Sequence, residues 1–176
     1  MQAAFEIERK YLIRMPDTER LARETGASVS RMVQTYLLSD AGTHRVRRIE
    51  TGAGVAFVET KKERVTALTA RESERTLSQA EYGTLLRSAD PKRTPIKKVR
   101  YTVPLADGVH KMEIDVYPFW RKTAVLEVEL CSEDDCFDLP TYIHVIREVS
   151  KDRRFKNYAL ARDIPDESEW EGEIAE

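Results

Sequence analysis

Pairs of like charge, spaced two residues apart, recur along this chain. In a strand, alternate side chains point to opposite faces, so Glu6, Glu8 and Lys10 would share one surface. The same spacing separates the acidic pairs Glu72/Glu74, Glu113/Asp115 and Glu127/Glu129 and the basic pairs Arg45/Arg47 and Lys98/Arg100. Converging carboxylates are ligands for hard divalent cations, whereas Arg and Lys bind phosphate. The pattern indicates metal-assisted chemistry on a polyphosphate, with no nucleophilic side chain required.

Two interpretations of these pairs are open. In the simpler one, each pair lies on the solvated face of a half-buried strand, and the apolar residues between the charges, such as Ile7 and Val46, form the core. Against it, two like charges 5 Å apart repel by roughly 3 kcal/mol at an effective dielectric constant of about 20. In the alternative, the charges line the inside of a closed barrel that is wide enough for a ligand.

Composition limits the possible partners. The chain has 176 residues, with 29 Lys and Arg against 31 Asp and Glu, so it has no basic excess that would indicate nucleic-acid binding. Because no run approaches the roughly 20 apolar residues of a membrane span, we expect a cytoplasmic protein that does not bind membranes. Neither the two cysteines nor the three histidines have the spacing of a zinc site.

Strand signals dominate the chain. Eight segments with alternating, β-branched or aromatic residues are predicted as strands, at 5–13, 32–38, 44–49, 55–62, 71–77, 97–103, 110–117 and 124–131. The Asp107–Gly108 pair marks a hairpin turn between two of them. This number of strands with short connections predicts a largely antiparallel sandwich or barrel.

Helices are predicted to be few and short. Asp17 can cap one helix, and Ser78 with Glu81 forms a capping box for a second. A third is expected to start at 132–135 and a fourth to span 156–162. The acidic residues 165–176 are expected to form a poorly ordered, flexible tail, in which Trp170 could dock on the body.

The order of these motifs resembles a known family. The segment EIERKYLI contains Glu-x-Glu-x-Lys, and it is followed by QTYLL at Gln34, RVR at Arg45, ETK ending at Lys61, KKVRY with Lys98 and Arg100, EID at Glu113, EVELCSED from Glu127 and DRRFKNYALA from Asp152. From about Phe5 to Arg162 the chain resembles the CYTH superfamily, the triphosphate tunnel metalloenzymes, and especially the small bacterial inorganic triphosphatases. The resemblance implies a mainly β (α+β) fold in residues 1–164, an eight-stranded antiparallel β-barrel tunnel with a few short helices packed outside.

The resemblance also implies roles for single residues. Glu6, Glu8, Glu127 and Glu129 would hold Mg2+ or Mn2+, and the phosphate-binding set would be Lys10, Arg45, Arg47, Lys61, Lys98, Arg100 and Arg154. Lys156 is an alternative to Arg154, near a segment that plugs one tunnel end in relatives. The catalytic set would be Glu72, Glu74, Asp115 and Lys10, where the three carboxylates hold a second metal or orient water. Lys61 is followed by Lys62, so either could face inward, and the ETK segment favours Lys61.

The leading hypothesis is a metal-dependent hydrolase that converts inorganic tripolyphosphate to pyrophosphate and phosphate with metal-activated water. Three alternatives stay open: an adenylate cyclase of the class IV type that makes cyclic AMP, a thiamine triphosphatase, and a non-catalytic module that binds polyphosphate or nucleotide. The expected partner in each case is a small-molecule triphosphate, and relatives make a homodimer plausible.

Overall fold

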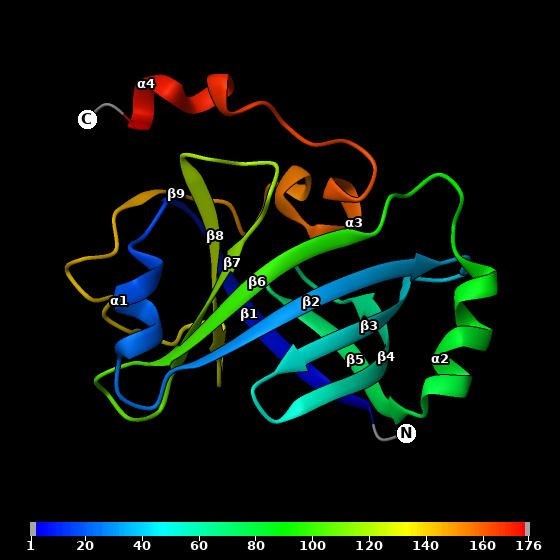
Figure 1. Ribbon diagram of the computed structural model, residues 1–176. Helices are drawn as coiled ribbons and strands as arrows, with labels where there is room; N and C mark the ends of the chain where they lie inside the picture. The colour runs from blue at the N-terminus through cyan, green and yellow to red at the C-terminus, as the bar shows by residue number, and fades with distance from the viewer. Residues whose placement is uncertain (1–2, 175–176) are drawn as a thin grey trace.

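Eight strands close into an antiparallel barrel (Figure 1) in the computed structural model, which describes residues 3–174. The strands are β1 Ala3–Arg14, β2 Ser28–Leu37, β3 Thr43–Thr51, β4 Gly54–Arg64, β5 Thr69–Leu77, β6 Ile96–Pro104, β7 Lys111–Val116 and β8 Thr123–Leu130. Their order is β5-β4-β3-β2-β6-β7-β8-β1, and the pairing of β5 with the first half of β1 closes the ring. The predicted fold and all eight strands are confirmed. A ninth strand, β9 (Val145–Glu148), which the sequence did not reveal, pairs with the second half of β1.

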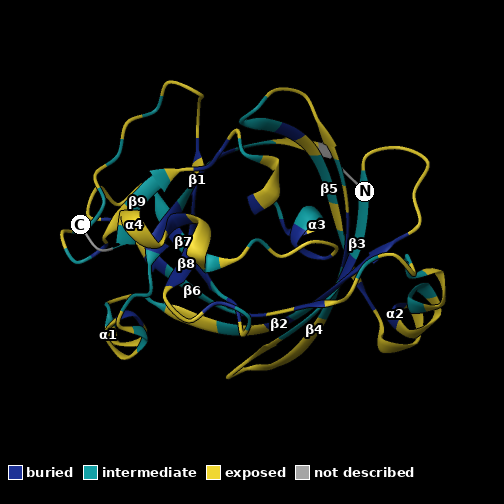
Figure 2. Cartoon of the chain, turned by 90° about the horizontal axis from the view of Figure 1, so that it is seen from above, coloured by how far each residue is buried: buried dark blue, intermediate teal, exposed yellow. Residues whose placement is uncertain are grey.

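Side-chain alternation places the charges inside the barrel. On β1, Glu8 and Lys10 are buried at 8% and 2% exposure, while Ile7 and Ile13 lie on the other face and pack in a hydrophobic cluster outside the ring. Figure 2 shows the ring from one end, with buried and half-buried segments along the strands. The second interpretation of the charge pairs is therefore correct, because the apolar residues between them face outward and form the core there.

Two helices cover the outside of the barrel on opposite flanks (Figure 2). Helix α1 (Thr18–Arg23) buries Leu21 in the cluster outside β1 and β6–β8, and helix α2 (Gln79–Leu85) buries Tyr82 against Leu77 and Val46. Both begin at the predicted caps: Asp17 accepts the N–H groups of residues 19 and 20 at 3.0 Å, and the capping box of residues 78 and 81 is complete.

The helix expected to start at 132–135 was predicted wrongly. These residues form a turn, because the Asp135 carboxylate accepts the backbone N–H groups of Cys131 at 2.6 Å and Ser132 at 3.2 Å. A side chain that caps preceding N–H groups in this way competes with the helix that the acidic run suggested. The predicted fourth helix exists but is short, α3 (Asn157–Leu160), and it follows the 3-10 turn η2 (Arg153–Phe155).

One end of the barrel is closed by an apolar cluster. Tyr36 of β2 and Tyr117, which directly follows β7, meet Phe155 of η2 and Leu160 of α3, and all four are buried. The acidic tail covers this cluster with the 3-10 turn η3 (Glu167–Trp170) and helix α4 (Glu171–Ile174), and Trp170 is 1% exposed. The docking of Trp170 on the body, which the sequence allowed, is observed, and this buried side chain and its neighbours anchor a segment whose composition is otherwise polar. Residues 175–176 lie outside the described part.

His110 links two surface loops, and its titration predicts a pH-dependent stability. Its Nδ1 lies 2.7 Å from the Asp107 carboxylate and its Nε2 3.4 Å from that of Asp135. The hydrogen bond with Asp107 raises the pKa of His110 above its ordinary value. The link therefore stabilises the fold fully below pH about 6.5 and is lost as pH rises through the higher folded-state pKa.

We expect His110→Gln to lower the melting temperature at pH 5.5 more than at pH 8.5. Melting curves of the variant and of the unchanged protein at both pH values measure this difference. A loss of equal size at both pH values would contradict the role given to the charged imidazole.

Candidate active site

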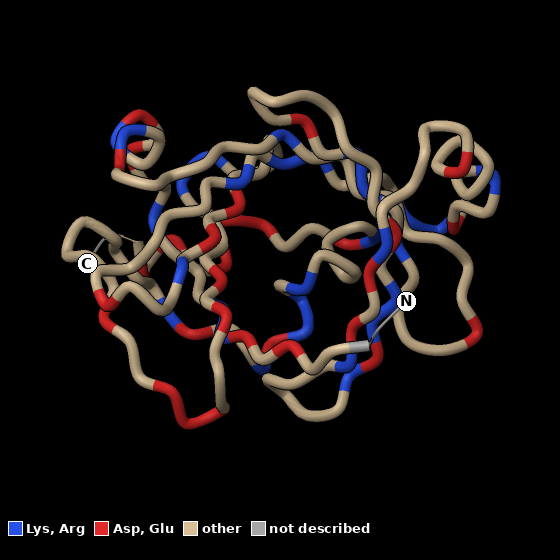
Figure 3. The backbone as a smooth tube through the Cα atoms, turned by 90° about the horizontal axis from the view of Figure 1, so that it is seen from below, with Lys and Arg blue, Asp and Glu red and all other residues tan. Residues whose placement is uncertain are grey.

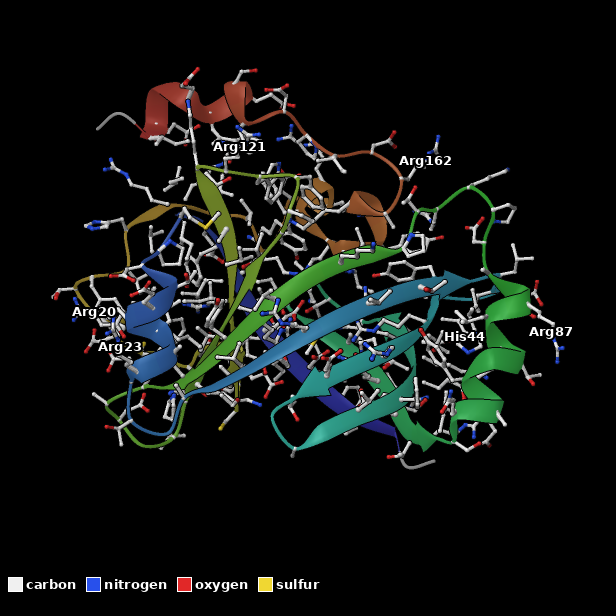
Figure 4. All side chains as sticks on the ribbon, in the orientation of Figure 1. Arg20, Arg23, His44, Arg87, Arg121 and Arg162 are labelled. Carbon is white, nitrogen blue, oxygen red and sulfur yellow. The ribbon has the colours of Figure 1, made fainter. Side chains whose placement is uncertain are left out.

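The barrel interior gathers charges of both signs. Seven basic side chains face inward, Lys10, Arg45, Arg47, Lys62, Lys98, Arg100 and Lys156, and they contact the carboxylates of Glu6, Glu8, Glu72, Glu74, Glu113, Asp115 and Glu127. Figure 3 shows basic and acidic segments alternating around the ring. By contrast, the arginines labelled on helices and loops in Figure 4, such as Arg20, Arg87 and Arg162, lie at the periphery. Because basic groups lie beside acidic groups, the interior can accept an anion and a cation at once.

On the wall formed by β6, β7 and β8, the charges neutralise one another. Arg100 donates to both carboxylate oxygens of Asp115 at 2.7 Å and to Glu127 at 2.8 Å, and it also contacts Glu113. Lys98 and Lys10, which are 4% and 2% exposed, contact Asp115 and Glu127 respectively. These ion pairs are the charge-assisted hydrogen bonds that make burial of so many charges tolerable.

Asp115 serves to hold cations in this arrangement. Burial alone would raise the pKa of Asp115, but the charges of Arg100 and Lys98 outweigh burial and lower the pKa below its ordinary value. Its two oxygens are engaged by these cations, and the Tyr117 hydroxyl lies 3.4 Å away. A carboxylate occupied in this way orients Arg100 and Lys98 and is poorly suited to activate water, which differs from the catalytic role predicted for it.

The opposite wall carries donors that are not fully used. Arg45 and Arg47 extend inward from β3, and the buried Nε–H group of each has no hydrogen-bond acceptor within residues 3–174. Burial, followed by the neighbouring charge of Arg45, lowers the pKa of Arg47 to about 10, so both guanidinium groups are charged at neutral pH. Two close, desolvated guanidinium groups with spare donors are a receptor for an anion such as a phosphate group.

Lys62 lies at the centre of a cluster of three carboxylates. Its Nζ contacts Glu6 and lies 3.6 Å from Glu72 and 4.0 Å from Glu8. One oxygen of Glu72, Oε2, is buried without a hydrogen-bond donor among the described residues. Three converging carboxylates are donors that suit Mg2+ or Mn2+, and a divalent ion there would take the place of the lysine ammonium.

The four carboxylates predicted to bind metal lie on the paired strands β1 and β8, where Glu8 is opposite Glu129, and they have different cation partners. Glu6 and Glu8 belong to the cluster around Lys62, but Glu127 is held by Lys10 and Arg100, and Glu129 lies 3.2 Å from Lys111 at the rim. In the described part of the chain, no group of three or more His, Cys, Asp or Glu side chains has the geometry of a formed metal site. Metal binding would thus require the carboxylates to exchange their lysine partners for the ion.

The open end of the barrel forms an acidic mouth. A cavity of about 450 Å3 is lined there by Glu6, Glu72, Glu74 and Glu129, together with the apolar residues Ile7 and Leu130. Glu74 accepts a hydrogen bond from the Thr60 hydroxyl at 3.1 Å and contacts Arg47. The catalytic candidates Glu72 and Glu74 are thus at the mouth, whereas Lys10 lies deep in the barrel.

Two of the predicted phosphate-binding residues lie outside the barrel. Lys61 is exposed on the outer face of β4, next to His44, because Thr60 and Lys62 share the inner face. Arg154 lies on the surface and pairs with Asp152 at 2.8 Å and Glu169 at 2.7 Å. Lys156 is the residue that enters the barrel, with its Nζ 3.1 Å from Glu8. The alternation of residues about Phe57, which packs outward against Tyr82, could have identified Lys62 from the sequence.

The neighbouring lysines of β4 provide a matched test of the inner and outer faces. We expect Lys62→Met to lower kcat/KM for inorganic tripolyphosphate, the substrate that the sequence predicts, by roughly 10- to 150-fold, the loss of one charge-assisted contact of about 1.5–3 kcal/mol. Lys61→Met should change kcat/KM by less than about twofold, because an exposed lysine contributes little. Steady-state kinetics of both variants measure this, and equal effects would contradict the assignment of faces.

Four further polar residues of the interior lay outside the predicted set. Gln34 is fully buried, donates to the Tyr36 hydroxyl at 2.8 Å and accepts from Arg45 at 3.4 Å. Tyr117 donates to Asn157 of α3 at 2.8 Å, and Glu113 contacts Arg100. Glu113 had the spacing that identified the others, but the contact between Tyr117 and Asn157 joins residues 40 positions apart and no local pattern indicates it.

Comparison with known proteins identifies a relative that matches nearly the whole chain. An inorganic triphosphatase of Nitrosomonas europaea is 32% identical over 164 residues, which cover 91% of this chain and 99% of the relative. No family model matches the chain.

Solved structures agree with this similarity. The crystal structure of an inorganic triphosphatase is 29% identical, covers 92% of this chain and 97% of its own, and superposes with a TM-score of 0.57. A protein from Pyrococcus horikoshii OT3, at 17% identity, covers 73% of this chain and 80% of its own with a TM-score of 0.56, and it supports the fold alone.

Proposed function

Because the chain belongs to the inorganic triphosphatases of the CYTH superfamily, we propose that it hydrolyses inorganic triphosphate to pyrophosphate and orthophosphate inside the barrel. The observation that carries this proposal is the pair of buried arginines, Arg45 and Arg47, whose Nε–H groups have no acceptor within residues 3–174, while their Nη2 atoms lie beside the carboxylates of Glu72 and Glu74. A linear, strongly anionic substrate fits such an interior, because each phosphate can meet a cation and the donors are already oriented.

The reaction needs positioning and charge stabilisation more than a nucleophilic residue. Water attacks the terminal phosphorus, the bond from this phosphorus to the bridging oxygen breaks, and pyrophosphate leaves with that oxygen. Arg45, Arg47 and Lys62 would bind the phosphates from one wall, while Lys156 and Lys10 approach from the β1 side. Glu74, which contacts Thr60 and Arg47 at the mouth, would orient the attacking water.

Glu6, Glu8 and Glu72 are the residues that would hold Mg2+ or Mn2+. A divalent ion bound there would neutralise charge on the phosphates and lower the pKa of a bound water. Its binding would also release Lys62 from these carboxylates. The lysine would then be free to meet a phosphate oxygen, so the cation and the substrate would favour each other's binding.

A panel of substrates tests the proposed reaction. Inorganic triphosphate, ATP, thiamine triphosphate and pyrophosphate would each be incubated with the enzyme and Mg2+ or Mn2+, and the products separated by ion chromatography. We expect the fastest release of orthophosphate from inorganic triphosphate. Cyclic AMP and pyrophosphate from ATP would indicate a cyclase instead, and tight binding of triphosphate without turnover would indicate a binding module.

Loss of a carboxylate from the cluster is expected to weaken metal binding. Glu8→Gln and Glu72→Gln should each raise the Kd for Mn2+ at least about tenfold, because each removes one charged oxygen ligand. Glu63→Gln, on the outer face of β4, is the control and should leave the Kd unchanged. Calorimetric titration with Mn2+ measures these constants without turnover. An unchanged Kd in both cluster variants would refute this metal site.

A cytoplasmic location and a small-molecule partner complete the proposal. The cysteines Cys131 and Cys136 are free thiols, which favours a reducing compartment. No helix within residues 3–174 is long and apolar enough to cross a membrane. The homodimer that the family resemblance allows stays a prediction.

A further inference from the structure

Lys156 has little regular structure of its own to hold it. It is the residue between the three-residue turn η2 and the four-residue helix α3, and its backbone is extended, with φ −79° and ψ 136°. Its Nζ nevertheless reaches the Glu8 carboxylate at 3.1 Å inside the barrel. Because two such short elements do not fix a long side chain, the position of Lys156 depends on what its neighbours contact.

Each neighbour of Lys156 is anchored to a different part of the molecule. On one side, Asn157 is buried and accepts a hydrogen bond from the Tyr117 hydroxyl at 2.8 Å. On the other side, Phe155 is fully buried, and its ring centroid lies 5.4 Å from that of Trp170. Thus one anchor comes from the barrel itself and the second comes from the C-terminal segment.

The C-terminal segment has firm attachments to the barrel. Pro165 accepts a hydrogen bond from the Trp120 indole at 3.0 Å. Glu167 accepts the backbone N–H groups of Arg121 and Lys122 at 2.9 and 2.8 Å. A further ion pair, at 2.7 Å, joins Glu169 to Arg154, two residues before Lys156. These contacts fix the segment in place, so that Trp170 packs against Phe155 of η2, the turn that precedes Lys156.

We propose that Trp170 is a positioning residue for Lys156. By packing on Phe155, the C-terminal segment determines how far the Lys156 side chain extends into the barrel. The inference rests on the proposed function, because there Lys156 meets a substrate phosphate. Trp170 itself packs in the apolar cluster with Phe155 and Trp120 and is not among the charged groups of the interior. A misplacement of about 1 Å in such a group can lower a rate by up to about 100-fold.

A double-mutant cycle tests the coupling. Trp170→Leu, Lys156→Met and the double variant would be assayed for hydrolysis of inorganic triphosphate, and each would be checked by thermal unfolding. We expect Trp170→Leu to lower kcat roughly tenfold in the unchanged background. In the Lys156→Met background it should lower kcat by less than about twofold, since the residue through which it acts is gone. Trp170→Phe, which preserves an aromatic contact, should restore most of the rate.

Exposed variants keep the test independent of folding. Glu169→Gln weakens the link to Arg154 without touching the core, and its smaller loss of kcat should also vanish in the Lys156→Met background. Glu171→Gln, in the same segment but paired with Lys122, is the matched control and should have no effect. If Trp170→Leu does not fold, the Glu169→Gln cycle decides alone.

The possible failures are distinguishable. If the unchanged protein releases no orthophosphate from any triphosphate, the proposed function is wrong. If the unchanged protein is active but the losses from position 170 or 169 add fully to that of Lys156→Met, Trp170 is merely structural and this inference is wrong. Full activity of Lys156→Met, or of both Trp170→Leu and Glu169→Gln, would overturn it as well.

Discussion

Replacing Arg100 with methionine is expected to lower the free energy of unfolding by about 3–5 kcal/mol, the cost of removing one partner from a buried ion pair. Arg100 contacts the carboxylates of Asp115, Glu113 and Glu127 at once, and Asp115 is fully buried. Without the guanidinium group, these carboxylates would repel one another in a site shielded from water. The loss is a large part of the 5–15 kcal/mol that typically stabilises a domain.

Urea denaturation of Arg100→Met at two pH values measures this effect. At pH 7 the three carboxylates are charged and the full loss is expected. The loss should shrink toward pH 4, because carboxylates without their cation have raised folded-state pKa values and take up protons. Arg31→Met, at an exposed position on β2, is the control and should change the unfolding free energy by less than about 0.5 kcal/mol. A loss in Arg100→Met no larger than that of the control would contradict the role of Arg100.

Replacing Arg47 with methionine is expected to raise the Kd for inorganic triphosphate by roughly 10- to 150-fold, equivalent to about 1.5–3 kcal/mol for one charge-assisted contact. Loss of Arg45 should have an effect of the same order. Both residues offer a buried, free Nε–H group. A bound phosphate would satisfy these donors and relieve the repulsion between the two guanidinium groups.

Arg48→Met is the matched control for this prediction. Arg48 is the next residue of β3, points to the outer face and lies 2.9 Å from Glu50, so its loss should change the Kd by less than about twofold. Isothermal calorimetry with inorganic triphosphate in the presence of a chelator compares Arg47→Met, Arg48→Met and the unchanged protein without hydrolysis. If Arg47→Met bound triphosphate as tightly as Arg48→Met, the phosphate site would have to lie elsewhere.

Much of the barrel could be predicted because its strands repeat one simple pattern. Glu6, Glu8 and Lys10 and the later pairs share a period of two, and this period fixes which residues lie on the same face. It does not say which face is the inside. The number of strands and the acidic repulsion favoured the interior, and the structure confirms it through Ile7 and Ile13, which pack outside.

The predictions that differ from the structure can also be explained in physical terms. Lys61 and Lys62 are adjacent cations, so residue type alone cannot choose between them, and the choice depends on the alternation about Phe57, which packs outward and thereby places Lys62 inside. Lys156 lies where two short turns meet, and no periodicity applies there. The acidic tail docks through Trp170, as the sequence allowed, and the hydrogen bonds of Glu167 and the ion pair of Glu169 add attachments that no local pattern indicates.

Metal-ligand sets are harder still to predict, because shared faces do not determine partners. Glu127 has the spacing of a ligand, yet Lys10 and Arg100 bind it from neighbouring strands. Glu72 lies directly opposite Lys62 in the pairing of β4 with β5, and the closure of β5 on β1 brings Glu6 beside them. Such contacts across the ring depend on barrel closure, which the local sequence does not encode.

The central claim, that water attacks the terminal phosphate of inorganic triphosphate in this barrel, is tested most directly by hydrolysis in 18O-labelled water. With Mg2+ or Mn2+ present, we predict equimolar orthophosphate and pyrophosphate. Mass spectrometry should find one 18O atom in the orthophosphate and none in the pyrophosphate. Label in the pyrophosphate would contradict attack at the terminal phosphorus, and no release of orthophosphate above the uncatalysed background would contradict the assigned function itself.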